Sequence, residues 1–157
     1  DQIKFLASKF MNASDLFFMG RGFDYALSLE ASLKLKEISY IHSEAYAAGE
    51  LKHGTISLIE QGTPVIALAT QKDIYEKTIS NIKETKSRGA NTLLFTTQNQ
   101  PVPDGVADYV VRLPEFEELL MPMLLIVPLQ LFAYYVSVLR GCDVDKPRNL
   151  AKSVTVE

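Results

Sequence analysis

Short apolar runs alternate with longer segments of helical periodicity along this chain. Runs that are apolar at nearly every position are typical of buried strands, and they fall at 15–20, 64–69, 91–96 and 108–113. Apolar residues spaced three or four apart predict helices, and these cover 2–12, 24–41, 72–88 and 115–139. Strands buried on both faces and separated by helices predict an α/β fold, with a parallel sheet between two layers of helices.

Sheets of this kind bind ligands at the carboxyl ends of their strands, where the strand order reverses. Gly20-Arg21-Gly22 follows the first predicted strand but lacks the rest of a dinucleotide fingerprint. The polar residues 96–100 follow the third strand and are more typical of a surface loop. No run rich in serine, threonine and glycine opens a helix. A phosphate-binding loop is therefore poorly represented.

Composition narrows the class of protein. The 157 residues are enough for one domain, and 47% hydrophobic with 22% charged residues is ordinary for a globular protein. A formal charge of −3 argues against a nucleic-acid binder. Cys142 is the only cysteine, so no intrachain disulfide can form and we expect a reducing compartment. Because the chain begins at Asp1, without methionine, we expect a piece of a longer protein.

The most apolar stretch, 119–129, has about eleven residues and contains two prolines. A helix that spans a bilayer needs roughly 20 apolar residues. We therefore expect this stretch to be a buried helix and not a membrane anchor.

The helix predicted over 24–41 carries Glu30, Lys34 and Glu37 at spacing i, i+4, i+7. This spacing places the three charges on one stripe of the helix. Apolar residues flank the stripe on both sides, and the opposite side, expected to face water, carries Ser28, Ser32, Lys36 and Ser39. Two interpretations stay open: a solvated stripe with an ordinary ion pair, or a half-buried stripe whose charges are used in chemistry.

His42 and His53 are the only histidines, so imidazole chemistry would have to use one of them. With a single cysteine they make no recognisable metal set. Lys152 stands among small residues near the carboxyl terminus. Such a segment is commonly a frayed tail, but a lysine held away from water loses affinity for its proton and can act as an amine nucleophile.

Three motifs carry a family resemblance. The runs LEASLKLKEISYIH (29–42), EAYAAGELKHG (44–54) and DVDKPRNLAKSVTVE (143–157) resemble the glucosamine-6-phosphate synthases, also called glutamine–fructose-6-phosphate amidotransferases. The resemblance covers the whole chain and about the last quarter of that enzyme, its second sugar-isomerase (SIS) domain. It implies a three-layer αβα fold with a flavodoxin- or Rossmann-like parallel sheet, formed by residues 1–142. Residues 143–157 would be a tail that contributes to the active site.

The resemblance also implies catalytic roles. Lys152 would form a Schiff base with the open-chain ketose, and Glu37 would move a proton between carbon 1 and carbon 2. His53 would assist ring opening from the neighbouring subunit of a homodimer. Lys34 would lie near the developing oxyanion. These roles agree with an enediol route, which needs one positioned carboxylate, a nearby cation and the exclusion of water.

Two binding residues follow from the same resemblance: Ala151 would contact the sugar, and Glu30 would be an orienting partner. The substrates would be fructose 6-phosphate and ammonia released from glutamine, and the product glucosamine 6-phosphate, a precursor of cell-wall amino sugars. We expect no cofactor, no metal, no nucleic acid and no membrane, and a cytoplasmic location. The glutaminase and the first SIS domain, which holds the sugar phosphate, lie outside this sequence, so we expect the chain alone to fold but to be inactive.

Two other functions remain as alternatives. SIS domains also occur as sugar-phosphate sensors in regulators, and such a sensor would not need Lys152, Glu37 and His53 together. A purely structural role as a dimerisation surface is the third possibility. Sedimentation would detect self-association, and a sensor would bind its ligand equally well without the tail.

Overall fold

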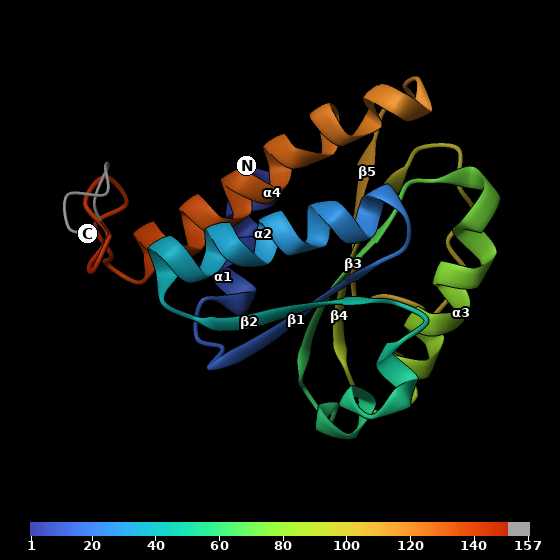
Figure 1. Ribbon diagram of the computed structural model, residues 1–157, viewed down its shortest axis with the longest axis horizontal. Helices are drawn as coiled ribbons and strands as arrows, with labels where there is room; N and C mark the ends of the chain where they lie inside the picture. Colours follow the sequence, from blue (N-terminus) through green and yellow to red (C-terminus); the bar gives the residue numbers. More distant parts are fainter. Residues whose placement is uncertain (151–157) are drawn as a thin grey trace, which may run out of the picture.

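A five-stranded parallel sheet forms the middle layer of the computed structural model, which describes residues 1–150 (Figure 1). Its strands are β1 (Asp15–Gly20), β2 (His42–Ala47), β3 (Pro64–Ala69), β4 (Asn91–Thr97) and β5 (Tyr109–Leu113). They lie in the order β2-β1-β3-β4-β5, and every pairing is parallel. The order reverses between β1 and β3, as in flavodoxin-like folds. The predicted three-layer α/β fold is confirmed.

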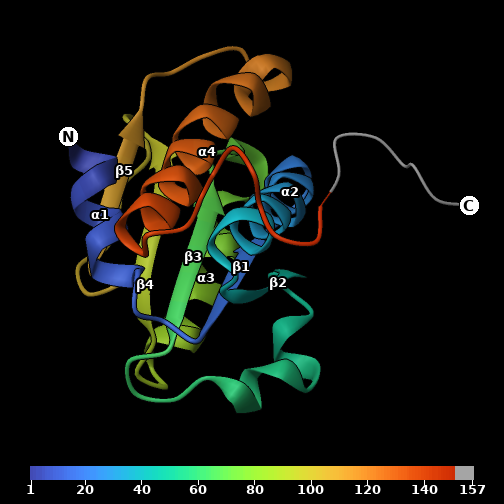
Figure 2. The same cartoon turned by 90° about the vertical axis from the view of Figure 1, so that its left-hand side faces the viewer.

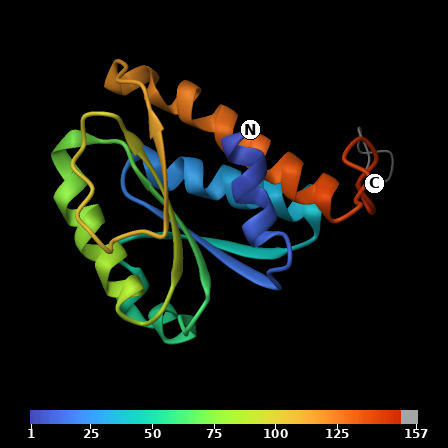
Figure 3. The ribbon, with the colours of Figure 1, turned by 180° about the vertical axis from the view of Figure 1, so that it is seen from behind.

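Helices cover both faces of the sheet. The helices are α1 (Gln2–Phe10), α2 (Phe23–Ser39), α3 (Tyr75–Lys86) and α4 (Met121–Leu139). Figure 2 shows α2 and α4 in front of the sheet with α3 behind it, and Figure 3 shows α1 lying against α4. Alternate residues of a strand point to opposite faces. In β3, Ile66 and Leu68 therefore join the core under α1, α2 and α4, whereas Val65 and Ala67 join the core under α3.

One strand was missed by the sequence analysis. All four predicted strands are present with ends shifted by no more than one residue, but β2 was not predicted. It lies at the edge of the sheet and, within residues 1–150, pairs with β1 alone. Its sequence, HSEAYA, is polar because an edge strand can expose part of its surface. A strand of this composition contains no continuous apolar run, so the sequence pattern did not predict it.

Helix α2 packs against the sheet with the side that was expected to face water. Ser28, Ser32 and Ser39 were expected to face water, but each is at most 2% exposed, whereas Leu29 and Leu33 are 48% and 44% exposed. Small hydroxyl side chains allow the helix to approach the sheet closely, and each finds a hydrogen-bond partner. Only Lys36, of the four residues on that side, is exposed as expected.

Ser32 also ties α2 to the edge strand. Its hydroxyl donates to the carbonyl oxygen of Ser43 at 3.0 Å, and the hydroxyl of Ser43 donates to the carbonyl oxygen of Ser32 at 3.0 Å. The two hydroxyl oxygens lie 2.9 Å apart. This reciprocal arrangement satisfies four buried polar atoms within one helix–strand contact.

The expectation that 119–129 is a buried helix is wrong for the outer face of α4. The helix is long and apolar enough to cross a membrane by length and composition, a test that core helices of soluble proteins also pass. One side packs into the core, but only 33% of its most apolar window is buried. The other side presents an apolar stripe, called here the α4 stripe, formed by Met123, Val127, Leu131, Tyr134 and Val138.

Candidate active site

Glu30, Lys34 and Glu37 form one ion-pair network on the outward side of α2. Lys34 Nζ lies 2.7 Å from Glu37 Oε2 and 3.7 Å from Glu30 Oε1. The three side chains are 41%, 35% and 28% exposed in the order of the sequence, so the network is half-buried. The hydrogen bond to Glu37 is the main cause that raises the pKa of Lys34. A permanent cation therefore lies beside a carboxylate, an arrangement suited to proton transfer next to developing negative charge.

The network lies on a helix surface and not at the carboxyl edge of the sheet, where ligands of such folds usually bind. At that edge, between β1 and β3, the protein's own groups fill the crevice. Asp24 is 2% exposed, and its carboxylate accepts from the backbone N–H and the hydroxyl of Thr70, both at 2.7 Å. Burial is the main cause that raises the pKa of Asp24.

The amino terminus of α2 is closed in the same way. Helix amino termini attract anions because their N–H groups have no partner within the helix. Here the side-chain oxygen of Gln71 accepts from the backbone N–H of Phe23 at 2.7 Å. Nearby, the Arg21 guanidinium donates to the Asn81 side-chain oxygen through Nε at 3.2 Å and Nη2 at 2.9 Å. The crevice between β1 and β3 is therefore occupied by internal contacts.

Sequence reasoning did not find Asp24, Thr70 or Gln71. The one available signal was an acidic residue at the start of a predicted helix, which is usual there because of the helix dipole. Its partner lies 46 positions away, so no local pattern could show that the carboxylate is buried.

His53 stands apart from the network on α2. It ends a short 3₁₀ turn, Leu51–His53, and its ring is 64% exposed. Its nearest charged partner is Glu50, with Nε2 4.0 Å from Oε2. Within residues 1–150, no hydrogen bond or ion pair joins His53 to Glu37 or Lys34. The structure of one chain therefore does not bring these predicted residues together.

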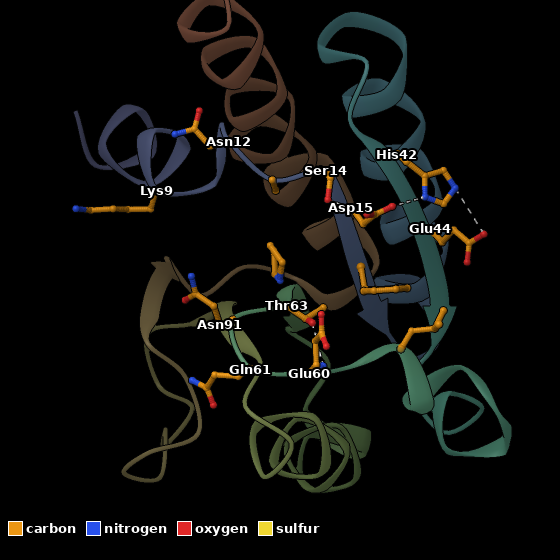
Figure 4. A pocket seen from close by; sticks show the side chains of 15 residues that line it. Lys9, Asn12, Ser14, Asp15, His42, Glu44, Glu60, Gln61, Thr63 and Asn91 are labelled. Atoms are coloured by element: carbon orange, nitrogen blue, oxygen red, sulfur yellow. Dashed lines mark hydrogen bonds and ion pairs between the residues drawn. The ribbon is translucent and has the colours of Figure 1, made fainter.

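A cavity of about 670 Å³ lies at the opposite, amino edge of the sheet (Figure 4). The first residues of β1, β2, β3 and β4 contribute to its wall. His42 lies there, with Nδ1 3.1 Å from Asp15 Oδ1 and Nε2 3.9 Å from Glu44 Oε1. The predicted catalytic residues that the structure describes, Lys34, Glu37 and His53, do not line this cavity. Its polar residues are the ordinary exposed ends of strands and loops, so we do not assign the chemistry to it.

Comparison with known sequences identifies the fold family. The sequence profile named "SIS domain" matches residues 9–140, which is most of the chain. The chain belongs to the SIS domain family. The matched segment holds the whole sheet, both histidines and the charged network of this SIS domain.

Long relatives contain a segment similar to this SIS domain. Over 155 residues it is 60% identical to the glutamine–fructose-6-phosphate aminotransferase [isomerizing] of Caldanaerobacter subterraneus subsp. tengcongensis, covering 99% of this chain and 26% of that protein. The protein of the same name from Methanosarcina acetivorans is 52% identical over 157 residues, covering 100% and 25%. The SIS domain thus spans about a quarter of the length of these curated relatives.

Solved structures agree with this assignment. The C-terminal domain of glucosamine-fructose-6-phosphate aminotransferase from Francisella tularensis superposes with a TM-score of 0.86 at 36% identity, over 93% of this SIS domain and 41% of that chain. A glucosamine-6-phosphate deaminase from Thermotoga maritima gives a TM-score of 0.70 at 28% identity, over 98% and 46%. In both cases the match covers less than half of the solved chain.

Two predicted site residues, Ala151 and Lys152, lie outside the described residues. The segment that leads to them is described as far as Leu150. After α4 it turns back over the carboxyl-terminal end of α2 (Figure 2). The described segment from Arg140 to Arg148 is therefore attached to the end of the same helix that carries the charged network.

Proposed function

We propose that this chain is the isomerase portion of a glucosamine-6-phosphate synthase, which converts fructose 6-phosphate and glutamine-derived ammonia to glucosamine 6-phosphate. The observation that carries the proposal is the network on α2, where a cation lies 2.7 Å from a half-buried carboxylate. Relatives 52–60% identical to the chain carry the name of this aminotransferase. The reaction would supply precursors of cell-wall amino sugars in the cytoplasm.

Lys152 would supply the amine that activates the ketose. Its free amine adds to carbon 2 of the open-chain sugar, and water leaves as the imine forms. Ammonia then displaces the lysine from carbon 2, so the sugar keeps a nitrogen and the lysine is regenerated. A proton moves from carbon 1 to carbon 2, and the hydroxyl proton on carbon 1 passes to the imine nitrogen, which leaves an amine on carbon 2 and an aldehyde at carbon 1. The sum is one ammonia consumed and one water released.

Glu37 would move that proton. A single carboxylate can remove it from carbon 1 and return it to carbon 2, because the two carbons are adjacent. The ion pair with Lys34 uses Oε2 of Glu37, so Oε1 is the oxygen that would face the sugar. Lys34 would stabilise negative charge on the sugar oxygen during the transfer. Glu30, 3.7 Å from Lys34, would orient the lysine.

His53 would act in the site of a second subunit and assist ring opening there. Its ring is 64% exposed, and its only charged neighbour in the described part of the chain is Glu50. This exposure supports a role at another copy of the chain, as a homodimer would provide. The exposed α4 stripe also supports further packing, since apolar side chains in a continuous row are typical of interfaces.

The remaining three quarters of the parent protein would hold the phosphate and deliver ammonia. In this chain Gln71 occupies the amino terminus of α2, and Asp24 with Thr70 fills the crevice beside it. These contacts support a phosphate site elsewhere in the parent. The isolated 157-residue chain would then fold but convert no fructose 6-phosphate, and Ala151 would contact sugar only in the whole enzyme.

Borohydride trapping tests the proposal. The whole parent enzyme is incubated with fructose 6-phosphate, reduced, and digested for mass spectrometry. We expect a sugar adduct on Lys152 and none after Lys152→Met. An adduct on another lysine, or measurable isomerisation with no adduct, would overturn the assigned role of Lys152. The 157-residue chain treated in the same way is the matched control, and appreciable conversion by it would contradict the predicted inactivity.

A further inference from the structure

Tyr40 adopts a backbone conformation that usually belongs to glycine. It follows the last residue of α2, its φ is 62°, and its N–H closes the helix by donating to the carbonyl oxygen of Lys36. Helices commonly end in this left-handed conformation, but glycine is preferred because a Cβ atom is strained there. A tyrosine at this position indicates that its side chain does something that glycine could not.

The side chain of Tyr40 holds a residue 108 positions away. The backbone N–H of Arg148 donates to the phenolic oxygen of Tyr40 at 2.9 Å. The Arg148 guanidinium carbon lies 4.0 Å from the centre of the same ring, which is the geometry of a cation–π contact. One ring therefore holds both the main chain and the side chain of Arg148.

A second attachment precedes this one along the same segment. Arg140 Nε donates to the carbonyl oxygen of Ser39 at 3.0 Å, so the end of α2 receives an arginine donor. The chain then turns at Asp143, whose Oδ1 accepts from the backbone N–H groups of Asp145 and Lys146, each at 3.0 Å. The segment from Arg140 to Arg148 is thus tied to α2 at both of its ends.

We propose that Tyr40 and Arg148 are positioning residues that hold the carboxyl-terminal segment so that Lys152 reaches the network on α2. The inference rests on the proposed function for the role of Lys152. Lys152 lies four positions after Arg148, a main-chain reach of at most roughly 14 Å. Along α2, Glu37 lies three residues before Tyr40, a rise of roughly 5 Å. Fixing Arg148 on Tyr40 would therefore keep Lys152 within this reach of the end of α2 that carries Glu37.

Three variants of the whole parent enzyme separate the two contacts. Tyr40→Phe removes the hydrogen bond and keeps the ring, Arg148→Ala removes the cation and keeps the backbone N–H, and Tyr40→Gly removes both while relieving the backbone. Arg88→Ala is the control, because Arg88 is an exposed arginine at the end of α3 on the other face of the sheet. The measurements are hydrogen exchange of residues 143–150 without substrate, the rate of borohydride trapping on Lys152, and the thermal midpoint.

We expect faster exchange in 143–150 for all three variants and unchanged exchange for Arg88→Ala. For Tyr40→Gly, we expect trapping to slow by about tenfold or more, while the thermal midpoint stays equal or rises. A merely structural tyrosine would lower the midpoint together with the trapping rate. The trapping rate of Tyr40→Phe should lie between that of Tyr40→Gly and that of the unchanged enzyme.

The measurements test the attachment of Arg148 to Tyr40 separately from its effect on Lys152. Exchange in 143–150 that is the same in Tyr40→Gly, Arg148→Ala and the unchanged enzyme would overturn the attachment itself. Faster exchange with trapping at the unchanged rate would overturn the positioning role. If the unchanged enzyme isomerises the sugar without any adduct on Lys152, the proposed role of Lys152 fails, and hydrogen exchange still decides whether the attachment exists.

Discussion

Lys34 Nζ lies 2.7 Å from Oε2 of Glu37, three residues further along the same helix. The contact is local, so α2 alone determines its geometry. It places a carboxylate and a cation side by side without any contribution from another part of the chain. The chemical proposal depends on this pair more than on any other contact.

Replacing Glu37, the proposed base, should therefore affect turnover more than binding. In the parent enzyme we expect Glu37→Gln to lower kcat by about 10²–10⁴, because the amide keeps the shape and can accept from Lys34 but cannot take a proton. KM should change only a few-fold. Steady-state kinetics with fructose 6-phosphate measure both. Glu30→Gln is the matched control and should lower kcat much less than Glu37→Gln does. A kcat of Glu37→Gln within tenfold of the normal value would exclude Glu37 as the base.

Mixed dimers test whether His53 acts across subunits. We expect His53→Ala and Glu37→Gln enzymes to be inactive separately, and to recover activity when they are denatured together and refolded. A mixed dimer would contain one site with both residues intact, so random mixing should restore about a quarter of normal activity. If His53 served its own subunit, every mixed dimer would have two defective sites. No recovery from correctly refolded mixtures would contradict the cross-subunit role.

The α4 stripe should matter to assembly and not to the fold of the domain. Val127 is 51% exposed, so Val127→Glu should change the unfolding free energy of the 157-residue chain by no more than about 0.5 kcal/mol. In the parent enzyme the same change would bury a charge at an interface and weaken packing. Sedimentation and thermal melting measure the two effects. Ser80→Glu, at an exposed position on α3, is the control. If both variants of the parent enzyme sediment and melt alike, nothing packs on the α4 stripe.

The buried Asp24 predicts a specific dependence of stability on pH. Burial raises its folded-state pKa above the ordinary value of 3.8, so the folded chain holds this proton more tightly than the unfolded chain. Stability from this group is therefore lost as pH rises from about 3.8 through the raised pKa. We expect the thermal midpoint of the unchanged chain, relative to Asp24→Asn, to fall as the pH rises from about 4 through the raised pKa of Asp24. A difference that is constant or rises with pH would contradict the assignment.

Local patterns in the sequence predicted most of the fold. Continuous apolar runs located four strands, because strands buried on both faces leave no polar alternation. The spacing of Glu30, Lys34 and Glu37 predicted their contact, and both ion pairs are present. The same reasoning missed β2, because an edge strand can be polar. It also placed the serines of α2 in water, since a small hydroxyl is equally suited to solvent and to a tight helix–sheet contact.

Contacts between distant parts of the chain were beyond sequence reasoning. Asp24 meets Thr70 across 46 positions, and Arg148 meets Tyr40 across 108. Such pairs depend on where the fold brings loops together, which neither periodicity nor composition encodes. The roles of Lys152 and His53 came from family resemblance and stay predictions. Of these two residues, the structure describes only His53, and it lies apart from α2.

The paired serines between α2 and β2 set how the helix is turned about its own axis. Ser32 and Ser43 exchange hydrogen bonds at 3.0 Å in both directions, so rotating α2 by one residue would break both and drive a larger side chain into the sheet. Buried contacts on the inner face of α2 therefore fix the rotation of the helix about its axis. Whatever docks on its outer surface, or leaves it during a catalytic cycle, meets Glu37 and Lys34 at a fixed angle. If other domains of a parent protein move, the Lys34–Glu37 pair would then keep its orientation relative to the sheet.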